Sequence, residues 1–65
     1  MDDQSSSTPG GSLHISRVYP SGGASTIVTY PDGVWTMMSF SSVRSAQEFA
    51  FVNNMEVTYS EEVEP

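Results

Sequence analysis

Residues 24–40 read ASTIVTYPDGVWTMMSF, and the rest of the predicted sheet is built around this stretch. Its two ends are rich in Val, Ile, Thr, Tyr and Trp, which are favoured in strands, and the tripeptide PDG (residues 31–33) lies between them. Proline presets φ for the first central position of a turn, and glycine accepts the left-handed conformation that follows. The stretch therefore predicts a β-hairpin with strands over residues 24–30 and 34–40.

The second of these strands is largely apolar on both faces. Thr36, Met38 and Phe40 alternate with Trp35 and Met37. A half-buried strand alternates apolar with polar residues, whereas a strand covered on both sides is apolar throughout. We therefore expect residues 34–40 to form a central strand of the sheet.

A further strand precedes the hairpin. Leu13, Ile15 and Tyr19 share one parity before the turn residues 20–23. This alternation predicts a strand over residues 13–19 with the three side chains on one face.

A helix follows the hairpin, because the apolar period changes after residue 40. We expect it to begin after Ser41 or Ser42, either of which can serve as the N-cap, and to end at Asn53-Asn54. A capping box at residues 45–48, SAQE, fits a start about one turn later. The apolar residues at helical spacing are Val43, Ala46, Phe49 and Ala50.

Beyond the helix, Met55, Val57 and Tyr59 alternate with polar residues, which predicts a half-buried fourth strand. The order β-β-β-α-β predicts a small α+β fold, in which a single-layer antiparallel sheet carries one helix packed on one face. The helix residues expected on the sheet are Phe49 and Ala50, and their expected contacts are Val28, Met38 and Phe40.

The two ends of the chain differ from its centre in composition. Residues 1–11, MDDQSSSTPGG, contain no apolar residue after the first methionine, so we expect a disordered N-terminal tail. Residues 61–65, EEVEP, predict an acidic C-terminal tail. A single α+β domain is then expected over residues 12–60.

The charge is strongly negative: eight acidic residues stand against two arginines and no lysine, for a formal net charge of -6. Such a charge repels nucleic acid and anionic membrane and attracts basic protein surfaces. No apolar run approaches the roughly 20 residues that a membrane span needs, and the acidic start differs from a secretory leader. We therefore expect a cytoplasmic protein that contacts neither membrane nor nucleic acid directly.

Residues for catalysis or metal binding are few. A nucleophilic enzyme needs an activated Ser, Cys or Lys beside a base, and this chain has no Cys, no Lys and one histidine. His14 is expected to be exposed to solvent or at an edge, and Glu61, Glu62 and Glu64 to be solvated. We therefore expect no enzymatic activity, no cofactor, no metal and no small-molecule substrate.

One part of the sequence resembles a known family. Residues 29–35 (TYPDGVW) and 40–42 (FSS), followed by Ala46 and Phe49, resemble the arm-type DNA-binding domains of tyrosine integrases. That resemblance implies a three-stranded sheet with one C-terminal helix, whose sheet enters the major groove. The sheet face of the family carries Lys and Arg, which neutralise phosphates, whereas this chain has only two arginines.

One helix covers one face of a sheet, so the other face, with Trp35 and Met37, is expected to meet solvent or another chain. Trp, Tyr and Met are favoured at protein interfaces. The alternative is that Trp35 anchors the core, and the fourth strand could instead be an edge that pairs with another chain. The predicted partner-binding residues are Trp35, Met37, Tyr19, Asp32, Glu48 and Glu56, the last three being the acids expected within the domain.

Charge and aromatic residues together favour a non-enzymatic protein-binding module, an inhibitor or adaptor that docks on a basic surface of a larger nucleic-acid-handling protein. In size, charge and lack of catalytic residues the chain is similar to the small acidic inhibitors that phages encode against transcription or CRISPR machinery. The alternative is a homodimer or other homo-oligomer built on the exposed sheet face or an edge strand. A third reading is a degenerate integrase-type DNA-binding domain.

The charge predicts that the protein does not bind duplex DNA, because two arginines release too few counterions to offset the repulsion. A fluorescence-anisotropy titration of a labelled duplex at low salt should show no binding. Saturable binding would favour the integrase-type reading.

Overall fold

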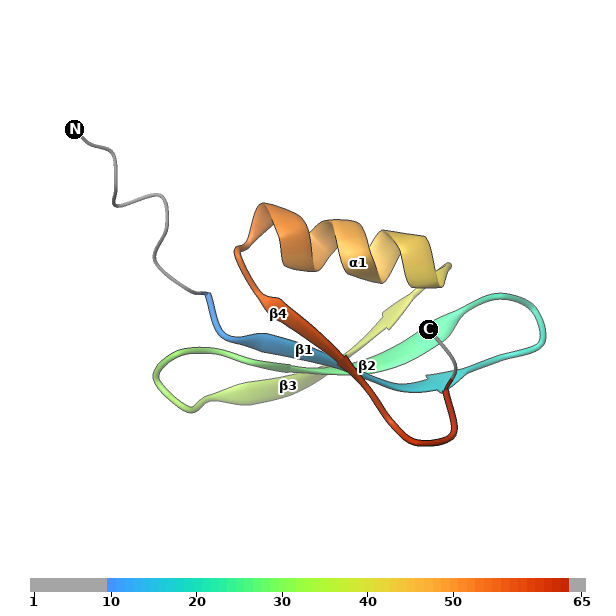
Figure 1. Ribbon diagram of the computed structural model, residues 1–65, viewed down its shortest axis with the longest axis horizontal. Coiled ribbons are helices and arrows are strands. Elements are labelled where there is room, and N and C mark those ends of the chain that lie inside the picture. The colour runs from blue at the N-terminus through green and yellow to red at the C-terminus, as the bar shows by residue number, and fades with distance from the viewer. Residues whose placement is uncertain (1–9, 64–65) are drawn as a thin grey trace.

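The computed structural model describes residues 10–63 as a four-stranded sheet with one helix (Figure 1). The predicted order β-β-β-α-β and the small α+β fold are confirmed. Residues 1–9 of the predicted N-terminal tail, and residues 64–65 of the acidic one, lie outside the described residues. The elements are β1 (Ser12–Val18), β2 (Ala24–Thr29), β3 (Trp35–Phe40), α1 (Val43–Val52) and β4 (Glu56–Tyr59), and the strand order is β3-β2-β1-β4.

The two hairpins, β1–β2 and β2–β3, use the same turn. In the second, the Gly33 N–H donates to the Tyr30 carbonyl (2.8 Å), and the Tyr30 N–H donates to the Val34 carbonyl (2.8 Å). Residues 19–23 repeat this pattern, with Gly22 in the place of Gly33. Both glycines have positive φ, 102° and 93°, as a three-residue hairpin loop requires at its last position. Each turn is therefore specified locally by a Tyr-Pro-x-Gly sequence.

The sheet is mixed, which differs from the predicted antiparallel sheet. β1, β2 and β3 pair antiparallel, but β4 pairs parallel to β1, with Ser12 opposite Glu56 and Ile15 opposite Tyr59. The helix accounts for this, since it returns the chain to the end of the sheet at which β3 began. β4 then runs in the direction of β3, which is also the direction of β1.

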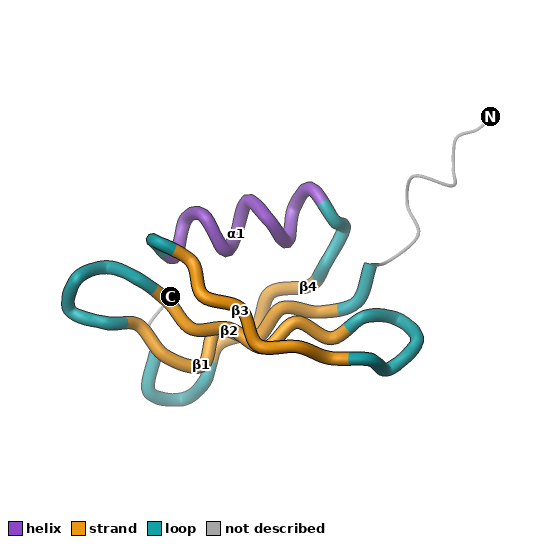
Figure 2. Tube along the Cα trace, turned by 180° about the vertical axis from the view of Figure 1, so that it is seen from behind, coloured by secondary structure: helices purple, strands orange, loops and turns teal. Residues whose placement is uncertain are grey.

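The prediction that residues 34–40 form a central strand is wrong, because β3 lies at an edge. β4 pairs with β1 on the far side of the sheet, so β1 and β2 are the inner strands (Figure 2). The apolar residues on the two faces of β3 therefore have different surroundings. Met38 and Phe40 pack against the core, whereas Trp35 and Met37 are exposed.

The core lies between α1 and one face of the sheet, which we call the helix face. Ala46 and Ala50 are fully buried, and their small side chains let the helix approach the sheet closely. The predicted packing of Phe49 and Ala50 is confirmed, and the Phe49 ring lies 5.5 Å from that of Phe40. Buried Thr26 donates its hydroxyl to the Met38 carbonyl (3.0 Å), so its polar atom is satisfied. The largest fully buried side chains of the strands are Leu13, Ile15, Thr26 and Val28.

The helix begins at the earlier of the two predicted starts. The Ser42 hydroxyl accepts a hydrogen bond from the Ser45 N–H (3.0 Å), as an N-cap does. At the other end Asn53 is the C-cap, and Asn54 has a left-handed φ of 58°. The predicted end at these two asparagines is confirmed.

A β-bulge in β1 changes which face its last residues occupy. The pairing shifts between Ile15 and Arg17, so Arg17 lies opposite Ser25 and Val18 opposite the buried Ala24. Side chains after the bulge therefore exchange faces. The alternation in the sequence predicts that Tyr19 shares a face with Leu13 and Ile15. In the structure the Tyr19 hydroxyl instead forms a hydrogen bond with the Ser25 hydroxyl (2.9 Å) on the opposite face.

Both predicted tails include residues that belong to the folded domain. The Gly10 N–H donates to the Asn54 carbonyl (2.9 Å), and the Gly11 carbonyl accepts from the Glu56 N–H (3.1 Å). At the C-terminal side Val63 packs against the core. The domain therefore extends beyond the predicted boundaries of 12 and 60.

Gly11 and Gly22 both have positive φ, but only Gly11 is enclosed, since a Cβ there would overlap the Thr29 carbonyl oxygen. Gly22→Ala should cost about 1–2 kcal/mol, the conformational penalty alone. Gly11→Ala should cost at least about 2 kcal/mol more, because backbone must also move apart. Urea denaturation of the two variants measures the difference, and equal losses would contradict it.

Candidate protein-binding surface

The face of the sheet opposite α1, which we call the open face, is not covered by any described element (Figures 1 and 2). Strand register arranges its side chains in rows that cross the sheet from β3 to β4. One row consists of Trp35, Thr29, Ser12 and Glu56, and the next of Met37, Ile27, His14 and Thr58. The open face is thus apolar at its β3 edge and polar toward β4.

Trp35 and Met37 are the most exposed large apolar residues of this face, with 61% and 70% of their surfaces accessible. The alternative that Trp35 anchors the core is therefore wrong. Ile27, the neighbour of Met37 on β2, is half-buried and extends the apolar area inward. Trp35, Met37 and Ile27 therefore form an exposed apolar patch at the β3 side of the open face.

The centre of the open face is polar and internally hydrogen-bonded. His14 Nδ1 lies 2.8 Å from Thr58 Oγ1, which joins β1 to β4 through their side chains. His14 is half-buried and lies on an inner strand, so it is not at an edge of the sheet. Its hydrogen-bond partner among the described residues is the hydroxyl of Thr58.

Tyr19 lies at the end of β1, where the bulge brings it to the open face. The guanidinium carbon of Arg17 is 5.6 Å from the centre of the Tyr19 ring, a cation–π distance. The Tyr19 hydroxyl contacts Ser25 on β2. This corner of the face therefore carries a positive charge, and Glu56 carries a negative charge on β4.

The six predicted partner-binding residues do not form one surface. Trp35, Met37, Tyr19 and Glu56 share the open face. Asp32 lies in the β2–β3 turn, where its carboxylate accepts a hydrogen bond from the Val34 N–H (3.0 Å) and so supports the turn.

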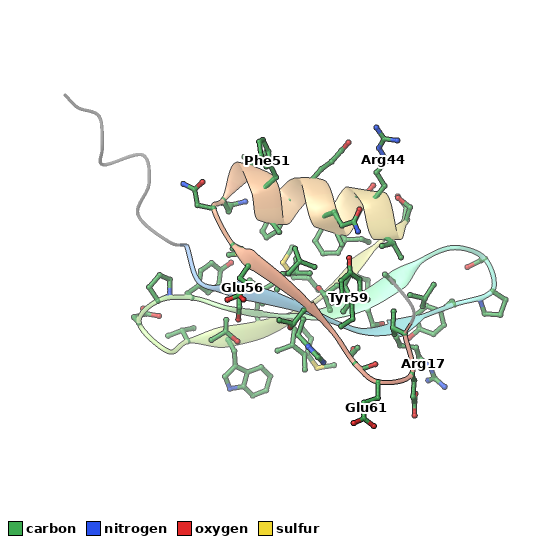
Figure 3. The ribbon with its side chains drawn as sticks, viewed as in Figure 1. Arg17, Arg44, Phe51, Glu56, Tyr59 and Glu61 are labelled. Atoms are coloured by element: carbon green, nitrogen blue, oxygen red, sulfur yellow. The ribbon has the colours of Figure 1, made fainter. Side chains whose placement is uncertain are left out.

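Arg44 points away from the sheet (Figure 3), and the Glu48 carboxylate, one turn further along α1, lies 3.5 Å from its guanidinium. Both side chains are largely exposed, so the pair contributes little to stability. Because the helix separates Glu48 from the open face, it can act there only through long-range charge.

Phe51 and Val52 are two exposed residues that the sequence analysis missed. They are 84% and 77% exposed, and Figure 3 shows Phe51 directed away from the sheet. The signal was present in the sequence. At about 100° per residue, a helix that turns Phe49 and Ala50 to the sheet must turn the next two residues outward.

A hollow of about 320 Å³ lies between the end of β1, the start of α1 and residues 62–63. Its lining includes Arg17, Glu62 and Val63. Within residues 10–63 no three His, Cys, Asp or Glu side chains are grouped so as to hold a metal ion. In the same part of the chain no helix is long and apolar enough to cross a membrane.

No protein-family model matches the sequence, and comparison with curated proteins and with solved structures finds no similar protein. The surface of the protein is therefore the basis for its functional assignment.

Trp35→Ala should lower the free energy of unfolding by less than about 1 kcal/mol, because the side chain is already mostly in water. Leu13→Ala, at a fully buried site, should cost about 2–5 kcal/mol. Urea denaturation followed by circular dichroism compares the two. A large loss for Trp35→Ala would mean that the tryptophan supports the fold rather than a surface.

Proposed function

We propose that this protein is a non-enzymatic protein-binding module whose open face docks on a basic surface of a larger protein. The observation that supports this most is the exposure of Trp35 and Met37 on a face that no described element covers. Tryptophan and methionine are enriched at the buried centres of protein interfaces. Covering them would remove from water the largest apolar side chains of this face.

The net charge supports a basic partner. At physiological salt, fields between exposed charges decay over about 8 Å, so a charge of -6 acts on a partner during approach rather than at a single contact. The described acids lie on several sides of the domain: Asp32, Glu48, Glu56, Glu61 and Glu62. This distribution favours faster association with a basic protein over imitation of a nucleic-acid backbone.

The surface also supports a division of roles within the interface. Trp35 and Met37 supply apolar contact at one edge, while His14, Thr58 and Ser12 supply hydroxyl and imidazole groups in the middle. Protein interfaces combine an apolar area that becomes buried with polar, hydrogen-bonding groups beside it, and this face carries both.

The test is affinity capture from a lysate of the native cell with immobilised wild-type protein and a Trp35→Ala/Met37→Ala variant. The wild type should retain one basic protein at low salt, and the double variant should lose at least about 90% of it, since hot-spot truncations cost 2 kcal/mol or more. Raising the salt should release the partner, because screening weakens its attraction to an acidic protein.

The matched control is Phe51→Ser/Val52→Ser, which removes two still more exposed apolar residues from the outer side of α1. This variant should retain the partner as the wild type does. If it loses the partner while the Trp35/Met37 variant keeps it, the binding surface lies on the helix and the proposal is wrong.

A further inference from the structure

The β3 edge lacks the features that usually prevent strands from pairing between molecules. Trp35–Phe40 contains no charged residue and no proline, and its pairing with β2 has no bulge. The other edge of the sheet is different. β4 has four residues, begins with Glu56 and is followed by Glu61 and Glu62. Only β3 is therefore a long, uncharged edge.

The backbone of β3 has three residues whose hydrogen-bonding groups face away from β2. The carbonyls of Val34 and Met38 are directed to β2, where they accept from Tyr30 N–H and the Thr26 hydroxyl. In an antiparallel pair the inward and outward positions alternate. The N–H and C=O groups of Trp35, Met37 and Ser39 therefore face outward, and the side chains of the same residues lie on the open face.

The outward-facing N–H and C=O groups of β3 can pair with the same groups of a second copy of the chain. In an antiparallel pair of two β3 strands centred on Met37, residue 37 lies opposite its own copy and Trp35 lies opposite Ser39 of the second copy. All three outward residues are then hydrogen-bonded, and Trp35 is diagonal to the second Met37, within reach of an aromatic side chain. A pair centred on Thr36 would leave Ser39 without a strand partner.

The charges of the domain also permit a second copy at this edge, despite repulsion between two chains of -6 each. Asp32 is the acid nearest to β3 in the sequence, and in this pairing the two Asp32 residues are roughly 30 Å apart along the strands. This exceeds the screening length of about 8 Å. A domain of 65 residues without cysteine also has few other means of burying more apolar surface.

We propose that two copies of the chain pair through antiparallel β3 strands about a twofold axis at Met37, forming one continuous eight-stranded sheet. The two Trp35 and two Met37 side chains then form a single apolar area at the centre of the combined open face. The dimer does not depend on the partner proposed above, and it would present that partner with a surface twice as large.

Sedimentation equilibrium of the purified chain at micromolar concentrations should give twice the 7.1 kDa mass of the monomer. Met37→Pro should give the monomer mass with an unchanged circular dichroism spectrum, because its lost N–H faces away from β2. Met37→Lys keeps this N–H and should also be monomeric, which covers the case in which the proline variant fails to fold. Higher salt should strengthen the dimer, the opposite of its effect on a basic partner.

Single cysteines test the register, because the natural chain has none and any disulfide must join two copies. Met37→Cys should cross-link, since opposed residues in such a pair have Cα atoms about 5.5 Å apart. Ser39→Cys, which is also exposed on the same face, should not, because its copies are roughly 14 Å apart. If the wild-type chain stays monomeric, the proposal is wrong, and the β3 edge is free to pair with a strand of another protein. Preferential cross-linking of Ser39→Cys overturns the register.

Discussion

The packing of Ala46 and Ala50 against the helix face is the interaction on which the rest of the structure depends. One ten-residue helix holds all four strands on one side, and its return across the sheet places β4 beside β1. A longer helix, or a second one, would cover more of the protein. With a single helix, residues 10–63 have one shared core, one uncovered sheet face and two uncovered strand edges.

The uncovered surfaces differ in the charged and apolar residues that they carry. The β4 edge and the turn after it carry carboxylates, and the outer side of α1 carries a weak Arg44–Glu48 pair. The β3 edge carries Trp35 and Met37 without any charge. A negative domain with one uncharged aromatic edge can attract a basic protein over a distance and still make its close contacts through apolar groups.

Much of the fold could be predicted from local sequence signals. The turn residues fixed the hairpins, Ser42 and the two asparagines fixed the helix, and the alternation in residues 55–59 indicated the fourth strand. What could not be predicted was the neighbour of each strand. Nothing in residues 34–40 shows that β4 would pair with β1, so the apolar content of β3 suggested burial on both faces. No residue pattern predicts the bulge at residues 15–17 either, and this bulge places Tyr19 on the other face. The aromatic residues of the candidate site, Trp35 and Tyr19, could therefore be chosen from composition. Their position relative to Asp32 and Glu48 could be known only once the structure showed which strands pair.

The repeated Tyr-Pro-x-Gly turns have a consequence for the order in which the chain folds. Each closes a hairpin between adjacent strands, so the contacts of β1, β2 and β3 span short stretches of chain and form with little loss of loop entropy. The β1–β4 pair joins residues 44 positions apart, as the His14–Thr58 contact shows, and it requires the helix to be in place. The meander can therefore form early, while β1 is still an unpaired edge. During that interval the nascent chain has edges at β1 and β3, and the arrival of β4 replaces the β1 edge with the short β4 edge, which begins with Glu56.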